Sequence, residues 1–261
     1  MKNTVLTRRQ LLKASALTAG GALLGTAPTL AQTATTTVHA DALNIAILLY
    51  DSFTALDAIG PYEMLYRIPG AAIHLVAKTL DPIRVDSQVL VVQPTITFKD
   101  IPTPQVIVVP GGFEGTFAAM QDETLLSWLR KAHETTLYIT SVCTGALILG
   151  AAGLLEGKDA TTHWYLADRL KDFGASYKPE RFVEQERIIT AAGVSAGLDF
   201  SLHLISKIGE NKTLFPDLSA EDIAKAIQLI TEYDPQPPFR SGSLETASAE
   251  TIQLVKSVLG S

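Results

Sequence analysis

The stretch LYITSVCTGALILG, residues 137–150, decides the fold class. Its first six residues form a short, mostly apolar run of the length of a buried strand, and the small and apolar residues from Thr144 onward are typical of a helix. Cys143 stands where one pattern changes into the other. A strand that passes directly into a helix is the repeating unit of parallel α/β sheets.

The same alternation recurs along the chain. We expect core strands at residues 44–49, 72–77 and 105–109, a hairpin-like excursion over 83–98 and paired strands over 181–192. Helices are expected at residues 54–66, 122–135, 144–150, 164–173, 196–208, 220–231 and 249–259. Parallel strands need crossovers that cover both faces of a sheet. The sequence therefore predicts one doubly wound α/β domain with a mostly parallel sheet over residues 41–261.

The first forty residues have the pattern of an export signal. Residues 7–13 (TRRQLLK) are basic, a mildly apolar run follows, and residues 27–31 (APTLA) end in small side chains. This is the order of a secretory signal, and the paired arginines resemble the twin-arginine signal of bacteria. A membrane anchor is the alternative, but Lys13, several glycines and Pro28 leave the apolar stretch short of the about 20 residues that a span needs.

We therefore expect residues 1–40 to be a twin-arginine-type signal and flexible leader. The sequence is compatible with cleavage after Ala31 or after Ala40. The expected location is the periplasm, with no stable membrane anchor after processing.

Composition narrows the class of partner. The chain is 47% hydrophobic and 18% charged, as in ordinary globular proteins. Its formal charge is −6; the first forty residues hold four basic side chains and no acid, so the remainder carries −10. An acidic body disfavours nucleic acid, whose phosphates need cationic contacts. There is also no ligand cluster with metal-site spacing and no phosphate-cradling glycine motif. A small-molecule substrate is the expected partner.

Cys143, the only cysteine, is the candidate nucleophile. A side chain on a strand-to-helix turn projects from the carboxyl edge of the sheet, where ligands of open α/β sheets bind. Helix N–H groups there stabilise a thiolate. The glycines of residues 110–112 (PGG) follow a neighbouring strand, so we expect the N–H groups of Gly112 and Thr144 to form an anion-stabilising pair. An inert buried cysteine is the alternative.

Two further side chains are candidates for proton transfer. Asp57 follows the first strand at the same edge, where a desolvated carboxyl can donate a proton or orient water; a helix-capping role is equally compatible with its spacing. His163 is a candidate secondary residue that completes a Cys–His pair, or else a packed structural histidine. Thr144 offers a hydroxyl beside the nucleophile.

Several motifs resemble the ThiJ/PfpI superfamily of class I glutamine amidotransferase-like proteins, and within it the isonitrile hydratase branch. The similarity extends over about residues 44–246. It is carried by residues 56–61 (LDAIGP), 109–112 (VPGG), 140–145 (TSVCTG), 160–164 (ATTHW), 232–235 (EYDP) and 237–239 (PPF).

The resemblance implies a flavodoxin-like three-layer sandwich, a homodimer and no cofactor. It implies that Cys143 is the nucleophile, with Asp57 where many superfamily members carry a glutamate. The implied reaction is hydration of an isonitrile to an N-substituted formamide. Cys143 would attack the terminal carbon, Asp57 would supply a proton, and Thr144 with the backbone near Gly112 would hold substrate or water.

Two departures from the branch matter for the substrate. Its members are usually without an export signal, and they tend towards glycine where this chain has residues 191–193 (AAG), so added methyl groups there narrow or reshape the pocket. Alternatives are another superfamily activity, glyoxalase-like, protease-like or stress-protective, and a ligand-sensing module related to the sensors of AraC-type regulators. A redox sensor based on oxidation of Cys143 is a third.

Overall fold

The structure is a computed structural model that describes Val38, residues 42–208 and residues 219–260. The expected export signal and leader lie outside the described residues apart from Val38, so that expectation stays a prediction. None of the helices in the described ranges combines the length and apolarity needed to cross a bilayer.

The centre of the domain is a seven-stranded sheet in the order β10-β11-β7-β6-β1-β2-β5. Every neighbouring pair is parallel except β10 and β11, which are antiparallel. All residues of β1 and β6 are buried, which explains their continuous apolar sequences. The strands are β1 (Leu43–Leu48), β2 (Ala71–Ala77), β5 (Ile96–Thr97), β6 (Val106–Val109), β7 (Tyr138–Val142), β10 (Phe182–Gln185) and β11 (Ile188–Ala191).

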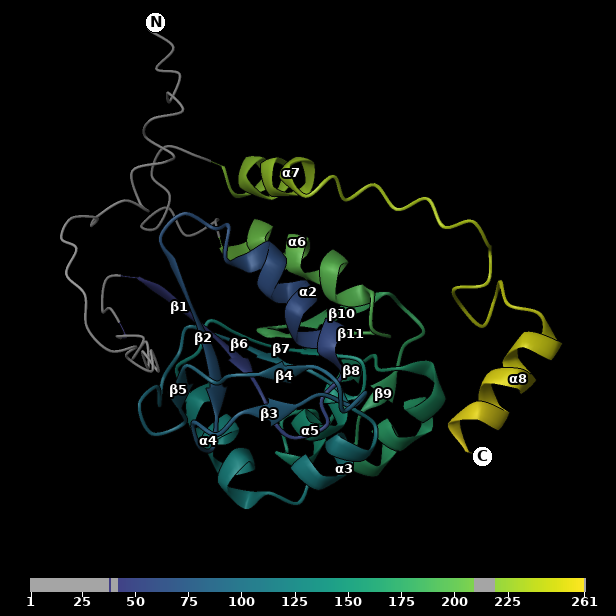
Figure 1. Ribbon diagram of the computed structural model, residues 1–261, viewed down its shortest axis with the longest axis horizontal. Coiled ribbons are helices and arrows are strands. Elements are labelled where there is room, and N and C mark those ends of the chain that lie inside the picture. The colour runs from purple at the N-terminus through teal and green to yellow at the C-terminus, as the bar shows by residue number, and fades with distance from the viewer. Residues whose placement is uncertain (1–37, 39–41, 209–218, 261) are drawn as a thin grey trace, which may run out of the picture. The chain divides into compact units, whose positions relative to one another are not determined.

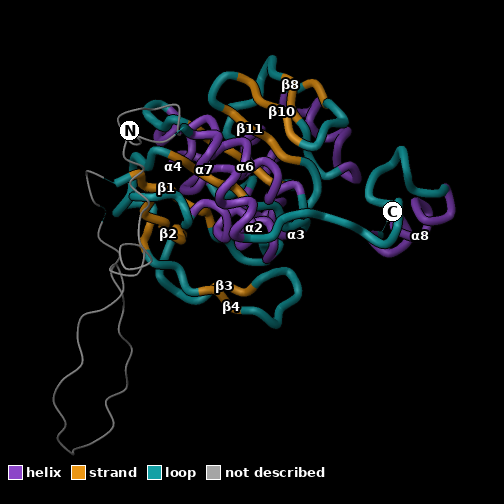
Figure 2. Tube along the Cα trace, turned by 90° about the horizontal axis from the view of Figure 1, so that it is seen from above, coloured by secondary structure: helices purple, strands orange, loops and turns teal. Residues whose placement is uncertain are grey.

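Helices cover both faces of this sheet. Figure 1 shows α2 and α6 on one face and α3, α4 and α5 on the other, and Figure 2 shows α7 beside α6. The expected doubly wound, flavodoxin-like three-layer sandwich is thereby confirmed. The helices are α2 (Ala55–Leu65), α3 (Glu114–Ala119), α4 (Glu123–His133), α5 (Gly145–Ala151), α6 (Ala196–Ile208), α7 (Ala220–Ile230) and α8 (Ala249–Leu259).

The strand order places a topological switch point between β1 and β6. From β1 the chain continues to β2 on one side, and it later returns to pair β6 and then β7 on the other side. Ligands of open α/β sheets bind outside the carboxyl ends of the strands at such a point. Asp57 follows β1, Gly111 follows β6 and Cys143 follows β7, so all three lie at this edge.

Some local expectations were wrong. The segment expected as an α-helix is the 3₁₀ helix η1 (Trp164–Phe173), which is kinked at Leu166 and ends at Gly174 in the left-handed conformation. Helix α3 was not predicted. Neither was the small parallel pair β8 (Asp159–Ala160) and β9 (Ser176–Tyr177). The hairpin-like excursion contains the antiparallel pair β3 (Ile83–Arg84) and β4 (Val91–Val92), but its last part joins the main sheet as β5.

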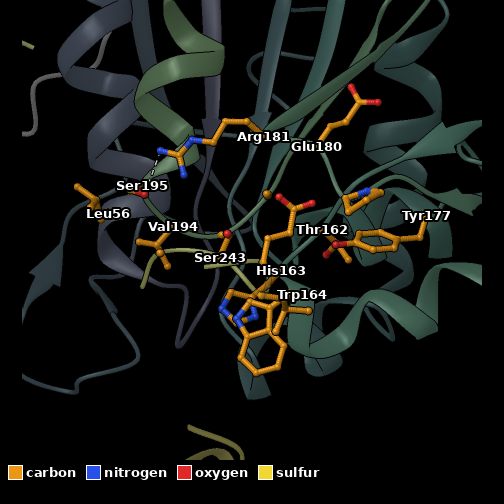
Figure 3. A pocket seen from close by; sticks show the side chains of 16 residues that line it. Leu56, Thr162, His163, Trp164, Tyr177, Glu180, Arg181, Val194, Ser195 and Ser243 are labelled. Atoms are coloured by element: carbon orange, nitrogen blue, oxygen red, sulfur yellow. Dashed lines mark hydrogen bonds between the residues drawn. The ribbon is translucent and has the colours of Figure 1, made fainter. Parts of the chain in front are cut away.

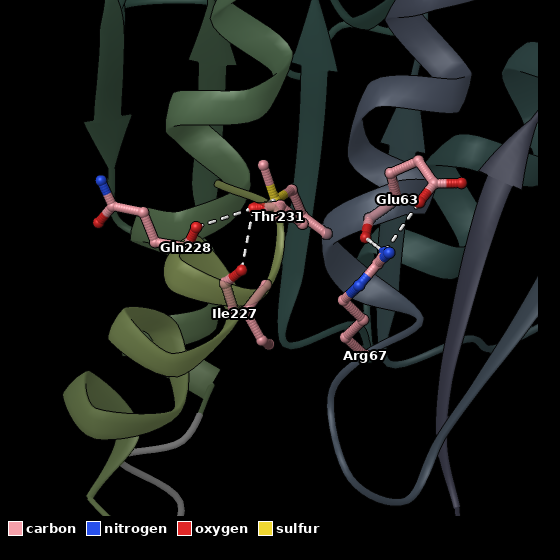
Figure 4. A network of polar contacts seen from close by, with 6 residues as sticks. Glu63, Arg67, Ile227, Gln228 and Thr231 are labelled. Carbon is pink, nitrogen blue, oxygen red and sulfur yellow. Dashed lines mark hydrogen bonds and ion pairs between the residues drawn. The ribbon is translucent and has the colours of Figure 1, made fainter. Parts of the chain in front are cut away.

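Helix α7 also touches α2 at its end. The Thr231 hydroxyl lies 2.9 Å from the Ile227 carbonyl oxygen and 3.9 Å from the Met64 sulfur (Figure 4). Glu63 in the last turn of α2 forms an ion pair with Arg67, two residues beyond the helix end.

Candidate active site

Cys143 occupies a sharp turn between β7 and α5. Its φ is 57°, a left-handed conformation that costs a non-glycine residue about 1 kcal/mol or more. The turn is held by its N–H, which donates to the carbonyl oxygens of Ala191 and Ala192 at 3.1 and 2.7 Å. The Thr162 hydroxyl donates to the Cys143 carbonyl at 2.8 Å. The side chain is fully buried, so these bonds fix a buried thiol at the edge of the sheet.

Asp57 lies in the first turn of α2 and is fully buried. Its Oδ2 accepts a hydrogen bond from the Gly111 N–H at 2.9 Å, while its Oδ1 is buried and has no hydrogen-bond partner among the described residues. The N-cap of α2 is Thr54, so Asp57 does not cap this helix. Its carboxyl instead faces the turn after β6 and interacts with the Cys143 thiol.

Burial sets the protonation of this pair. It raises the pKa of Asp57 from 3.8 to about 7, against the lowering effects of the Gly111 hydrogen bond and of the neighbouring Cys143 thiol. Burial also raises the pKa of the Cys143 thiol well above its ordinary value, and the negative charge of Asp57 adds to this. The Thr144 N–H favours the thiolate but is outweighed. The expected standing thiolate is therefore not the resting form at neutral pH, which is a thiol beside a carboxyl that titrates near 7.

The turn at residues 110–112 directs its two glycine amides to different partners. Gly111 N–H donates to Asp57, and Gly112 N–H donates to the Thr144 hydroxyl oxygen at 3.0 Å. A methyl group on Gly111 would lie 2.5 Å from both the Thr144 nitrogen and its hydroxyl oxygen, so this approach needs glycine. In this arrangement the Gly112 N–H is engaged by a side chain instead of facing a reacting anion beside the Thr144 N–H.

Two buried residues that the sequence analysis did not single out, Thr116 and Tyr50, extend the hydrogen bonds of Thr144. Its hydroxyl lies 2.7 Å from that of Thr116, which lies 3.2 Å from the Tyr50 hydroxyl. Thr116 belongs to α3, which has no clear periodic signal in the sequence. Tyr50 stands two residues beyond β1, and nothing in the local pattern distinguishes it from a core aromatic residue.

A pocket of about 490 Å³ is lined by residues that neighbour the buried pair, although neither Cys143 nor Asp57 lines it (Figure 3). Thr162 and Ala192 line it and both bond the backbone of Cys143, while Leu56 lines it next to Asp57 in the sequence. Most of the remaining wall comes from the end of β9 with the segment that precedes β10, the turn before α6 and the segment that precedes α8. It includes His163, Trp164, Tyr177, Arg181, Val194, Ser195 and Leu244.

His163 lines this pocket without joining the buried pair. Its Nδ1 accepts a hydrogen bond from the Tyr165 N–H at 3.3 Å, and burial lowers its pKa. The ring is therefore neutral at neutral pH, and its proton lies on Nε2. Within the described ranges no hydrogen bond connects it to Cys143, so the structure does not bring the two expected partners into a Cys–His pair.

Arg181 at the pocket is held by acidic and polar neighbours. It donates to Asp199 at 2.6 Å and to Ser195 at 3.0 Å, and the Tyr233 hydroxyl bonds the other Asp199 oxygen at 3.0 Å. This network ties the wall of the pocket to α6 and to the segment after α7. Across the described part of the chain, no three His, Cys, Asp or Glu side chains are grouped to hold a metal ion.

Comparison with known proteins places this site in a family. The DJ-1/PfpI family matches residues 43–207. Isonitrile hydratase from Pseudomonas putida is 43% identical over 211 residues, which are 81% of this chain and 87% of that protein. The crystal structure of a ThiJ/PfpI family protein from Pseudomonas syringae has a TM-score of 0.77 and 38% identity, covering 91% of this chain and 93% of that one.

A relative with a different described role is the HTH-type transcriptional regulator CdhR of Pseudomonas aeruginosa. It is 35% identical over 108 residues, which are 39% of this chain and 30% of the regulator. The family match covers more than half of the chain and includes every residue of the buried site. The resemblance drawn from the motifs is confirmed, and the chain belongs to the DJ-1/PfpI family.

Proposed function

We propose that this protein hydrates an isonitrile to an N-substituted formamide, with Cys143 as nucleophile and Asp57 as the carrier of a proton. The observation that carries the proposal is the fully buried pair of one thiol and one carboxyl, whose neighbours Leu56, Thr162 and Ala192 line a pocket of about 490 Å³. The extensive similarity to an isonitrile hydratase supports it.

In the first step the terminal carbon of the isonitrile forms two new bonds, one to hydrogen and one to sulfur. The step therefore needs a proton donor and a sulfur nucleophile. The thiol supplies both. Asp57 takes the Cys143 proton and delivers it to the terminal carbon, while the sulfur forms a bond to the same carbon. The product is a thioimidate, R–N=CH–S–Cys143, and Asp57 is a carboxylate again. A carboxyl with a pKa of about 7 is suited to both halves of this transfer at neutral pH.

Water completes the reaction. It adds to the thioimidate carbon, with Asp57 taking one of its protons and the substrate nitrogen gaining one. The carbon–sulfur bond then breaks and R–NH–CHO leaves. The proton that Asp57 took from water passes to the Cys143 sulfur, which restores the thiol and the carboxylate. The Thr144 N–H, which faces the sulfur, stabilises the thiolate that leaves in this step. In this proposal Thr144 acts on the thiol of Cys143. The backbone near Gly112 acts by forming the turn that holds Asp57.

The test follows the infrared isonitrile band and identifies the formamide by mass spectrometry, with several alkyl and aryl isonitriles. We expect turnover by the protein and loss of at least about a thousandfold in Cys143→Ala. Methylglyoxal is offered in parallel as a substrate of the rival glyoxalase-like activity. Full hydratase activity in Cys143→Ala, or turnover of methylglyoxal alone, contradicts the proposal.

We also propose that residues 1–40 direct export to the periplasm and that the mature protein is a homodimer. The paired arginines support the first part, and the second rests on the resemblance to the superfamily. Cell fractionation of the protein and of its Arg8→Lys, Arg9→Lys double variant tests the address. Sedimentation of the mature chain tests the dimer.

A further inference from the structure

A continuous chain of hydroxyl groups lies beneath the turn at residues 110–112. Gly112 N–H bonds Thr144 at 3.0 Å, the Thr144 and Thr116 hydroxyls are 2.7 Å apart, and those of Thr116 and Tyr50 are 3.2 Å apart. The Tyr50 hydroxyl then donates to the Pro110 carbonyl oxygen at 2.8 Å. All three hydroxyl residues are buried. We call this set of groups the hydroxyl relay.

The direction of every bond in the relay is determined. Burial raises the pKa of Tyr50 well above its ordinary value, so Tyr50 keeps its single hydrogen, and a carbonyl can only accept it. Tyr50 must therefore accept from Thr116, and Thr116, having given its hydrogen, must accept from Thr144. Thr144 accepts from the Gly112 N–H. No donor or acceptor is opposed to another, as a rigid arrangement requires.

The relay begins and ends on the same turn. Its first donor is the amide of Gly112 and its last acceptor is the carbonyl of Pro110, so it closes across the residue between them. That residue is Gly111, whose N–H holds Oδ2 of Asp57. Fixing the two neighbours of Gly111 fixes the direction of its N–H. The relay thereby reaches Asp57 without touching it.

We propose that Tyr50 and Thr116 are positioning residues, which hold the Gly111 N–H on the Asp57 carboxyl through Thr144 and the turn at residues 110–112. This inference rests on the proposed function, since it assigns them a part in the proton transfer that Asp57 performs. A purely structural role would stabilise the fold and leave the protonation of Asp57 unchanged. The two roles therefore differ in what happens to the pH dependence.

The first experiment breaks the relay at Thr116. In Thr116→Val we expect kcat at neutral pH to fall about tenfold with little change in KM, because the reacting groups lose their alignment. The pH at half-maximal rate should rise by about 0.5 to 1 unit, since a weaker bond from Gly111 removes a stabiliser of the Asp57 carboxylate. Thr116→Ser restores the hydroxyl and should restore both values.

The matched control is Thr140→Val. Thr140 is also a fully buried threonine, and its hydroxyl donates to the Ile107 carbonyl at 2.9 Å, away from the relay. The Thr140→Val variant should lose about as much stability as Thr116→Val but keep the pH profile of the unchanged protein. Tyr50→Phe breaks the relay at its other end. The double variant Tyr50→Phe, Thr116→Val should lose little more activity than either single variant, because one broken link already opens a series of bonds.

A second readout needs no substrate. The difference in unfolding free energy between a protein and its Asp57→Asn counterpart, followed from pH 4 to pH 9, gives the pKa of Asp57 in the folded state. We expect this pKa to be higher in the Thr116→Val background and unchanged in the Thr140→Val background. An unchanged pKa in both Thr116→Val and Tyr50→Phe overturns the inference. This result is independent of whether any isonitrile is turned over, which tests the proposed function alone.

Discussion

The carboxyl of Asp57 and the backbone amide of Gly111, 54 residues apart in the chain, are joined by a hydrogen bond of 2.9 Å. The bond engages one carboxyl oxygen, while the other is buried and has no hydrogen-bond partner in the part of the chain that the structure describes. An asymmetric carboxyl of this kind is held in place by one oxygen and can exchange a proton through the other.

Replacing Asp57 by asparagine should lower kcat and raise the unfolding free energy at pH 8. Loss of the proton carrier should lower kcat about 10²- to 10⁴-fold, while the side-chain oxygen still accepts from Gly111. The folded-state pKa is raised from 3.8 to about 7, so the buried carboxyl makes the folded protein less stable once the unfolded chain ionises. This loss of stability grows as the pH rises from 3.8 to about 7 and is constant above that. Asp57→Asn should therefore be more stable by up to about 4 kcal/mol at pH 8, with almost no difference near pH 4.

Urea unfolding at the two pH values measures this difference. Asp172→Asn, at an exposed ion pair with Arg169, is the control and should change stability little at either pH. An Asp57→Asn protein that is less stable at pH 8 than at pH 4, relative to the unchanged chain, would refute the raised pKa.

The pH dependence of catalysis should show one limb near neutrality. Below about pH 7 Asp57 is protonated and cannot take the thiol proton, so kcat/KM should fall towards tenfold per pH unit as the pH is lowered. Above pH 7 the rate should reach a plateau that persists until the thiol itself ionises, at a pH well above the ordinary range for cysteine. Initial rates from pH 5 to pH 9.5 test this; a rate that increases on acidification through pH 7 contradicts it.

Gly111→Ala should remove activity by steric means. Its methyl group would approach the nitrogen and hydroxyl oxygen of Thr144 to 2.5 Å and Oδ2 of Asp57 to 3.0 Å, so the turn must move. We expect kcat to fall at least about a hundredfold, because displacement of a reacting group by 1 Å has this effect. Gly153→Ala is the control for stability, since it strains a residue with φ of 78° and has no neighbour within 4 Å. Similar losses of activity in both variants would show that stability alone is responsible.

Gly193→Ala should change substrate preference. The added methyl would lie 3.2 Å from Cδ2 of His163, so the ring must give way by a few tenths of an ångström in the wall of the pocket that both residues line. We expect KM to rise several-fold for bulky aryl isonitriles and little for small alkyl ones, with kcat preserved. Gly60→Ala, whose methyl makes only ordinary contacts from 3.5 Å, serves as the comparison. An equal effect on large and small substrates would exclude a steric role for this position.

The layered fold and the positions of Cys143 and Asp57 at the sheet edge were predictable because both depend on local pattern. Apolar runs such as β1 and β6 are buried on both faces, and the strand-to-helix change at Cys143 places the thiol at the carboxyl edge whatever packs around it. The motif around Asp57 gave the second member of the pair. The 3₁₀ type of helix η1 was not predicted, because its amphipathic sequence fits both an α-helix and a 3₁₀ helix. Its kink at Leu166 depends on tertiary packing.

The hydrogen bonds and protonation of the site could not be predicted in the same way. Thr116 belongs to a six-residue helix with no periodic signal, and Tyr50 looks like any aromatic residue beside a strand. The choice of Thr144 as the partner of Gly112 depends on a distance between two turns, which no spacing in the sequence determines. The thiol was expected to be ionised because a helix start favours thiolates, but complete burial and the neighbouring carboxyl dominate.

The solitary, fully enclosed position of Cys143 also provides a built-in gauge of how often the domain opens. A thiol reagent too bulky for the pocket can modify the native protein only after local or global unfolding, and no other sulfhydryl contributes to the signal. Labelling rates measured across a denaturant series would therefore separate small fluctuations at the β7–α5 junction from cooperative loss of the whole sheet. The same atom that is proposed to attack the substrate would thus report, without any added probe, the free energy of the motion that exposes it.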